Sequence, residues 1–195
     1  MPPTMATPHH RVLVTVDIEG STTRTNPAKA QLRRAMYELV EAALEACGIA
    51  EQHRDPMIDR GDGVLIVIHP VDQAPKTLLL NTLVPTLSAL LGRYNTGRPE
   101  ESFRLRAAVH AGEVLYDRQG CFGEALDITF RLLDAPEVKG TLSRTGAPLV
   151  LVVSDDIYRT VIRHRYAGID DRAFEQIVRV NVAGQVYYGW VHVPA

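Results

Sequence analysis

Cysteine is scarce in this sequence: only Cys47 and Cys121 occur in 195 residues. Two cysteines are too few for a disulfide framework, and their separation does not fit the paired spacing of a zinc site. We therefore interpret both as packing residues of a protein from a reducing compartment, the cytoplasm.

Long apolar runs are also missing, because no segment approaches the roughly 18 residues that a membrane-spanning helix needs. The first ten residues contain no apolar stretch of the signal-peptide type. The formal net charge is only −2 at pH 7, which gives no electrostatic preference for nucleic acid or for an anionic membrane. We expect a soluble cytoplasmic protein whose partners are neither nucleic acids nor membranes.

What the chain does contain is enough apolar material for a core. Hydrophobic residues make up 46% and charged residues 23% of the sequence, which excludes an intrinsically disordered chain. Its 195 residues fit one domain at roughly 150 residues per domain. No change in composition divides the sequence, so we expect a flexible tail at 1–10 and a single domain at 11–195.

The first half of the chain predicts a strand, a helix, a hairpin and a second helix. Asn26 followed by Pro27 is typical of a helix start, and Asp62 lies between two glycines as in a tight turn. The expected elements are a strand at 11–16, a helix from 26 to Gly48, a hairpin over 58–68 and a helix from 75 to 91 with a bend at Pro85.

The second half predicts further strands with helices between them. The expected elements are a loop at 94–102, a strand at 103–109, a hairpin through Gly112, a helix at 123–133, a strand at 149–153, a helix that Ser154 caps and that runs to about 164, and a closing hairpin of 178–182 and 186–193. The order indicates an α/β fold, an α+β sandwich with a mostly antiparallel sheet.

Two aspartates are the first candidates for chemistry. Asp17 follows a buried strand and Asp62 lies in a hairpin turn, so a sheet with these strands side by side brings the carboxylates together. Adjacent carboxylates repel unless a cation lies between them, and Mg²⁺ prefers such oxygen ligands. A structural explanation stays open, because Asp is a common turn and capping residue.

Four segments, in order, resemble the signatures of class III nucleotidyl cyclase catalytic domains. They read Val-Asp-Ile-Glu-Gly-Ser-Thr at 16–22, Arg-Gly-Asp-Gly-Val-Leu at 60–65, Leu-Arg-Ala-Ala-Val-His-Ala-Gly-Glu-Val at 105–114 and Gly-Glu-Ala-Leu-Asp-Ile-Thr-Phe-Arg-Leu at 123–132. The resemblance is greatest to small stand-alone cyclase-like proteins of actinomycetes. It implies a ferredoxin-like palm core and a head-to-tail homodimer with composite sites at the interface.

The resemblance also implies roles for particular residues. Asp17, Asp62 and the backbone carbonyl of Ile18 match the ligands of a pair of Mg or Mn ions. Arg131 matches the arginine that stabilises the reacting phosphorus from the other subunit. The triphosphate would be held by the backbone amides of the turn that follows the first strand, which contains Ile18, Glu19, Gly20, Ser21 and Thr22.

Four positions depart from the family pattern, and one of them is Glu19, where the family often has an aromatic residue. Asp127 replaces the transition-state asparagine, and on a helix it can pair with Arg131. Ile58 replaces the lysine that reads the purine, and Gly120 replaces the acidic or polar partner of that lysine. The expected purine-reading pair is therefore absent from this sequence.

These matches and departures predict a nucleotidyl cyclase homology domain that binds a metal–nucleoside triphosphate at a homodimer interface. We expect it to be weakly active or catalytically degenerate, with a regulatory role and a possible regulatory protein partner. One alternative is an active ATP or GTP cyclase that uses Arg60 or backbone groups for the purine. Another is a ligand-free structural or partner-binding module.

Overall fold

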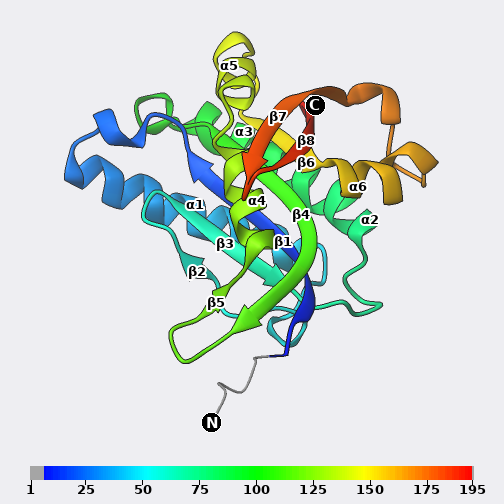
Figure 1. Ribbon diagram of the computed structural model, residues 1–195. Coiled ribbons are helices and arrows are strands. Elements are labelled where there is room, and N and C mark those ends of the chain that lie inside the picture. Colours follow the sequence, from blue (N-terminus) through cyan, green and yellow to red (C-terminus); the bar gives the residue numbers. More distant parts are fainter. Residues whose placement is uncertain (1–6, 195) are drawn as a thin grey trace.

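The computed structural model describes residues 7–194 of the chain (Figure 1). Residues 1–6 of the expected tail lie outside this range. His9 and His10, which were assigned to the tail, instead begin the first strand. The sequence-based boundary at residue 11 is therefore two residues late. No helix within residues 7–194 has the length and apolar character to cross a membrane.

A single eight-stranded sheet forms the centre of the molecule, in the order β2-β3-β1-β4-β6-β8-β7, with β5 paired to β4. Among the strands of residues 7–194, only β4 and β6 pair in parallel, so the predicted mostly antiparallel α/β sandwich is confirmed. The strands are β1 (His9–Ile18), β2 (Ile58–Asp59), β3 (Gly63–Ile68), β4 (Leu105–Tyr116), β5 (Cys121–Phe122), β6 (Leu149–Ser154), β7 (Glu175–Val182) and β8 (Gln185–His192).

Helices cover both faces of the sheet. Successive strand residues point to opposite faces, so Val12 and Val14 of β1 join one apolar cluster and Leu13 joins another. The first face packs against α1 (Asn26–Ala46), α2 (Lys76–Leu78), α3 (Val84–Gly97) and α6 (Asp155–Thr160). The second face packs against α4 (Glu124–Leu133) and α5 (Pro136–Arg144).

The second long helix deviates from α geometry just before Pro85. A π-helical segment, Leu79–Leu83, separates α2 from α3. Proline lacks the N–H that would bond one turn back, and wider turns are one way in which a helix accommodates such a residue. The helical irregularity thus lies just before Pro85, and the expected bend at Pro85 itself stays a prediction. The helix continues to Gly97, so the predicted loop at 94–102 begins too early.

The predicted hairpin through Gly112 is wrong. β4 continues through this position, where Gly112 pairs with Arg11. A Cβ atom at residue 112 would lie 2.8 Å from the Cβ of Ala125, so the glycine permits close approach of α4 to the sheet. The actual turn comes later, where the Asp117 carboxylate accepts the backbone N–H groups of Gln119 and Gly120.

Other local expectations are confirmed. The Ser154 hydroxyl accepts the N–H of Ile157 and caps α6. The closing hairpin forms as β7 and β8. Cys47 and Cys121 are partly buried against apolar clusters, as packing residues should be. Helix α5 was not anticipated from the sequence.

Candidate functional site

The two candidate metal-binding aspartates converge because β1 and β3 are neighbours. Asp17 lies opposite Gly63 in the register of the two strands, and the Ile18 N–H donates to the Asp62 carbonyl at 2.9 Å. A Cβ atom at residue 63 would lie 2.5 Å from the carbonyl oxygen of Val16. Glycine at this position therefore allows the approach. Asp17 and Asp62 line one cavity of about 190 Å³, as the strand-pairing argument predicts.

Asp17 has one occupied and one unsatisfied carboxylate oxygen. Its side chain is only 15% exposed, and Oδ2 lies 2.5 Å from a guanidinium nitrogen of Arg106. Oδ1 is buried and has no hydrogen-bond partner within the described residues. Burial raises the pKa of Asp17 to about 6; Arg106 opposes this rise and Asp62 adds to it. A cation at Oδ1 would satisfy the orphaned oxygen.

Few side chains near Asp17 could coordinate a metal ion. Within residues 7–194, no group of three or more His, Cys, Asp or Glu side chains is arranged to hold a metal ion. Mg²⁺ usually binds through one or two carboxylates and completes its shell with water and substrate phosphates. The Asp17–Asp62 pair therefore fits a cation that arrives with a phosphate ligand better than a resident structural metal.

The turn after β1 is joined directly to Asp62. Gly20 adopts a left-handed conformation with φ of 64°, and residues 21–23 form a short 3₁₀ turn. The buried hydroxyl of Ser21 donates to Oδ2 of Asp62. The geometry of this turn and the position of the second aspartate are thus coupled.

A second cavity, of about 340 Å³, lies between this turn and α1. Ser21, Thr22 and Asp62 line it, together with three basic residues that the sequence analysis did not single out: Arg24, Lys29 and Arg33. The available signal was the spacing of Lys29 and Arg33, which lie one helical turn apart and share a face. Arg33 is paired with Asp59, so Arg24 and Lys29 supply the uncompensated positive charge beside Asp62, which favours an anionic ligand.

Arg33 also organises the neighbouring hairpin. It forms an ion pair with Asp59 at 2.5 Å and donates to the carbonyl of Gly61. This hydrogen bonding holds the pKa of the exposed Asp59 carboxyl at about 2. The hairpin that carries Asp62 is therefore attached to α1.

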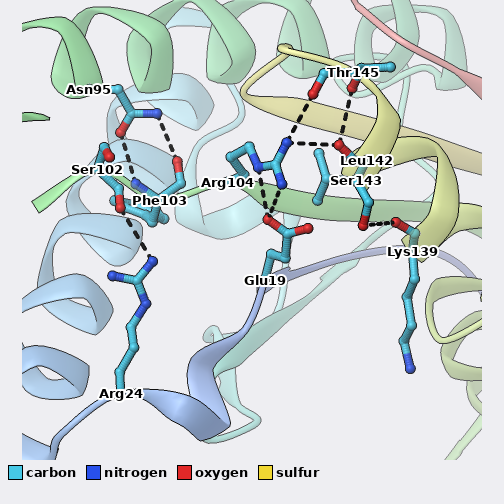
Figure 2. A network of polar contacts seen from close by, with 10 residues as sticks. All are labelled: Glu19, Arg24, Asn95, Ser102, Phe103, Arg104, Lys139, Leu142, Ser143 and Thr145. Carbon is cyan, nitrogen blue, oxygen red and sulfur yellow. Dashed lines mark hydrogen bonds and ion pairs between the residues drawn. The ribbon is translucent and has the colours of Figure 1, made fainter.

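Glu19 points away from the basic cavity, although it was predicted to belong to the triphosphate turn. Figure 2 shows its carboxylate facing Arg104, whose guanidinium donates to Oε2 at 2.8 Å. The same guanidinium donates to the carbonyls of Leu142 and Thr145, at 2.8 and 3.0 Å, at the end of α5. Arg104 therefore connects the turn to α5.

The other end of the turn is held by the segment that precedes β4. Arg24 donates to the Ser102 carbonyl at 3.3 Å (Figure 2). The Asn95 side chain fixes this segment, because it donates to the Phe103 carbonyl and accepts the Phe103 N–H, at 2.7 and 3.1 Å. The predicted triphosphate turn is thus attached at both ends.

The expected ion pair between Asp127 and Arg131 does not form. Both side chains are exposed on α4, and within residues 7–194 no ion pair joins them. An exposed helical pair contributes only about 0.3–0.5 kcal/mol, too little to fix two mobile side chains. Both residues line an open groove of about 500 Å³ that also contains Arg60 and Phe130.

The positions expected to read a purine are apolar or remote from polar groups. Ile58 is half-buried and packs against the apolar cluster under α4, as do Tyr116, Cys121 and Phe130. Gly120 lies in the turn between β4 and β5. Arg60 lies at the edge of this cluster, and its guanidinium lies 4.2 Å from the centre of the Phe130 ring.

Comparison with known proteins places the chain by its fold. No protein-family model and no curated protein matches the sequence. An adenylate/guanylate cyclase/hydrolase from Silicibacter pomeroyi is 16% identical, with a TM-score of 0.68, and the match covers 97% of this chain and 99% of that one.

Two guanylyl cyclase domains of known structure give similar matches. A guanylate cyclase domain from Catenaria anguillulae in complex with GTP is 16% identical, with a TM-score of 0.63 and coverage of 96% and 98%. A dimeric guanylyl cyclase domain from Blastocladiella emersonii is 14% identical, with a TM-score of 0.61 and coverage of 95% and 97%. The chain has the fold of nucleotidyl cyclase catalytic domains, which confirms the fold that the sequence resemblance implied.

Proposed function

We propose that this chain is a nucleotidyl cyclase homology domain that binds a nucleoside triphosphate together with Mg²⁺ or Mn²⁺. The observation that carries the proposal is the orphaned Oδ1 of Asp17, which shares a cavity with Asp62, while Asp62 also lines the basic cavity. Cyclase folds in complex with GTP, such as the Catenaria domain, support a nucleotide as the ligand class.

Asp17, Asp62 and the carbonyl of Ile18 are the residues that would hold the metal. When bound, a divalent ion neutralises phosphate charge and stabilises charge that develops on the transferring phosphorus. The backbone amides of residues 20–22 would bind the phosphate oxygens, whereas the Glu19 N–H already donates to the Arg104 carbonyl at 3.0 Å. Arg24 and Lys29 would supply positive charge along the adjoining wall.

We further propose that the functional unit is a homodimer in the cytoplasm. Arg131 of the partner subunit would act on the triphosphate held by Asp17 and Asp62, because a single chain leaves Arg131 exposed on α4. Asp127 places a negative charge one turn away on the same helix, which opposes an anionic substrate. Turnover is therefore weak, and the domain serves a regulatory role, alone or with a regulatory protein.

Binding measured by calorimetry tests this proposal. With Mn²⁺ present, the parent should bind nucleoside triphosphates, and Asp17→Asn and Asp62→Asn should each weaken binding at least tenfold, since each removes a charged ligand of a hard cation. Asp72→Asn is the matched control, because Asp72 is exposed and outside the site. If the double variant bound metal and nucleotide as tightly as the parent, the site assignment would be wrong.

Two further measurements separate the alternatives. Light scattering at tens of micromolar should show a dimer, and a monomer would remove the basis for a composite site. Product analysis with each triphosphate distinguishes a degenerate domain from an active ATP or GTP cyclase. A chain that binds no triphosphate under any of these conditions would be a structural or partner-binding module.

A further inference from the structure

Arg60 presents an unpaired cation beside the carboxylate pair. Within residues 7–194, its side chain forms no hydrogen bond or ion pair, and its guanidinium lies 4.2 Å from the centre of the Phe130 ring. Such stacking leaves the N–H groups in the plane of the guanidinium free to donate. Arg33, on the other side of the same hairpin, is fully engaged by Asp59 and Gly61.

Arg60 lies between a cavity and a groove. It lines the small cavity with Asp17 and Asp62, and it also lines the groove of about 500 Å³ with Asp127 and Arg131. A groove of that volume is within the usual range for small-molecule sites, roughly 300–1,000 Å³.

The groove offers few free acceptors to a ligand. Of its two aspartates, Asp134 is paired with Lys139 at 2.5 Å and approached by Arg106, so within residues 7–194 Asp127 is the carboxylate left free beside Arg60 and Arg131. The basic cavity beside α1 suits phosphate. Asn181 adds a side-chain amide to the groove, and its oxygen already accepts the Gly184 N–H. The groups left free are mainly hydrogen-bond donors.

We infer that Arg60, stacked on Phe130, recognises the base of the bound nucleotide and selects guanine over adenine. Guanine presents two adjacent acceptors, O6 and N7, which match the two parallel N–H donors of a guanidinium. Adenine presents an amino donor at the position of O6, which opposes one of these donors. This inference rests on the proposed function, and it names the preferred substrate class and the residue that selects it.

The position of Arg60, in the same groove as Arg131, is consistent with the proposed active site formed by both subunits of a dimer. Arg131 lines the same groove and is assigned to the triphosphate held by the partner subunit. The base recognised by Arg60 therefore belongs to the nucleotide on which Arg131 acts.

The test compares GTP and ATP binding in the presence of Mn²⁺ by calorimetry. The parent should bind GTP about tenfold to a hundredfold more tightly than ATP, the discrimination typical of one bidentate contact. Arg60→Gln should remove the preference, because an amide pairs its donor and its acceptor with adenine rather than with O6 and N7 of guanine. Arg60→Lys keeps a donor to these two acceptors and should retain part of the preference. Arg93→Gln, at an exposed position of α3, is the control.

Two analogues sharpen the result. ITP keeps O6 and N7 and should bind like GTP, whereas 7-deaza-GTP lacks one acceptor and should bind like ATP. Equal binding of GTP and ATP by the parent, or an unchanged guanine preference in Arg60→Gln, would overturn this inference and leave the proposed function intact. Binding of no triphosphate by the parent would overturn both.

Discussion

Arg106 and Asp17 face each other across β1 and β4, and the guanidinium of Arg106 lies 2.5 Å from Oδ2 of Asp17. Both side chains are nearly buried, at 10% and 15% exposure. Arg106 also approaches Asp134, which is paired with Lys139 at 2.5 Å. Asp17 therefore has Arg106 on one oxygen, and its other oxygen has no hydrogen-bond partner within residues 7–194, so a bound metal ion would share this carboxylate with Arg106.

Removal of Arg106 tests whether Arg106 and a metal ion can both neutralise Asp17. Arg106→Met leaves Asp17 buried without its counter-charge, so the free energy of unfolding at pH 7 should fall by about 3 kcal/mol. Mn²⁺ should recover part of the loss, because it can supply the missing positive charge. Denaturant unfolding with and without Mn²⁺ measures both effects.

Arg93→Met, on the exposed face of α3, is the control for the loss of an arginine. It should change the free energy of unfolding by less than about 0.5 kcal/mol. The idea fails if Mn²⁺ stabilises Arg106→Met no more than it stabilises the parent.

His110 gives the apo protein a pH dependence. Its Nδ1 lies 2.9 Å from the Ser154 hydroxyl, and burial lowers the pKa of His110 from 6.5 to about 4. Between these values the unfolded chain binds more protons than the folded chain, so this contribution to stability decreases as the pH falls from 6.5 to 4. The decrease is on the order of 3 kcal/mol. It should be absent in His110→Gln.

Asp17 acts in the opposite direction over an overlapping range. Its pKa is raised from 3.8 to about 6, so its contribution to stability is present below pH 4 and is lost as the pH rises through 6. Urea unfolding of the parent and of His110→Gln between pH 4 and 7 separates the two groups. Identical pH profiles for the two proteins would rule out His110 as a source of the dependence.

The connection from Glu19 through Arg104 to α5 predicts an effect on the phosphate side of the site. Arg104→Met removes the donor to Glu19 and leaves the carbonyls of Leu142 and Thr145 without this partner. The turn at 19–24 should become less ordered, and triphosphate affinity should fall about tenfold, while Mn²⁺ binding at Asp17 is kept. Glu19→Gln retains an acceptor and should have a smaller effect. Unchanged triphosphate affinity in Arg104→Met would show that the turn needs no such anchor.

The convergence of Asp17 and Asp62 was predictable because local signals defined both positions. A β-branched run placed Asp17 at a strand end, and glycines placed Asp62 in a turn. The approximate fold followed from the same kind of periodicity. The pairing of Asp17 with Arg106 was not predicted, since a strand pattern alone does not specify which residue lies opposite.

Other features depend on packing that a single sequence does not encode locally. Lys29 and Arg33 face the basic cavity only because of how α1 lies on the sheet. Gly112 was interpreted as a turn residue, but its role is close approach to Ala125. Both uses of glycine follow from its missing side chain, so the residue type alone does not distinguish them. Asp127 and Arg131 lie four residues apart on α4, the spacing of a helical ion pair. Because both side chains are exposed to solvent, the pair does not form.

Asp127→Asn should raise cyclase activity, or produce a trace where the parent has none. The substitution keeps the shape of the side chain, removes a negative charge near an anionic substrate and supplies an amide donor. One donor to charge that develops in the transition state is worth about 10²–10³ in rate. Because Asp127 forms no ion pair with Arg131, the gain comes from these two changes and not from release of the arginine. Cyclic product formed with Mn²⁺ and GTP or ATP is the measurement.

Two further variants test whether the effect of Asp127→Asn is specific to this site. Asp72→Asn removes an exposed aspartate elsewhere and should leave product formation unchanged. The Asp127→Asn, Arg131→Ala double variant should lose the gain, since the amide and the guanidinium act on the same developing charge. If Asp127→Asn dimerises and binds nucleotide yet forms no more product than the parent, Asp127 is not what limits turnover. The limit would then lie on the base side of the site, where Ile58 and Gly120 provide no polar contact.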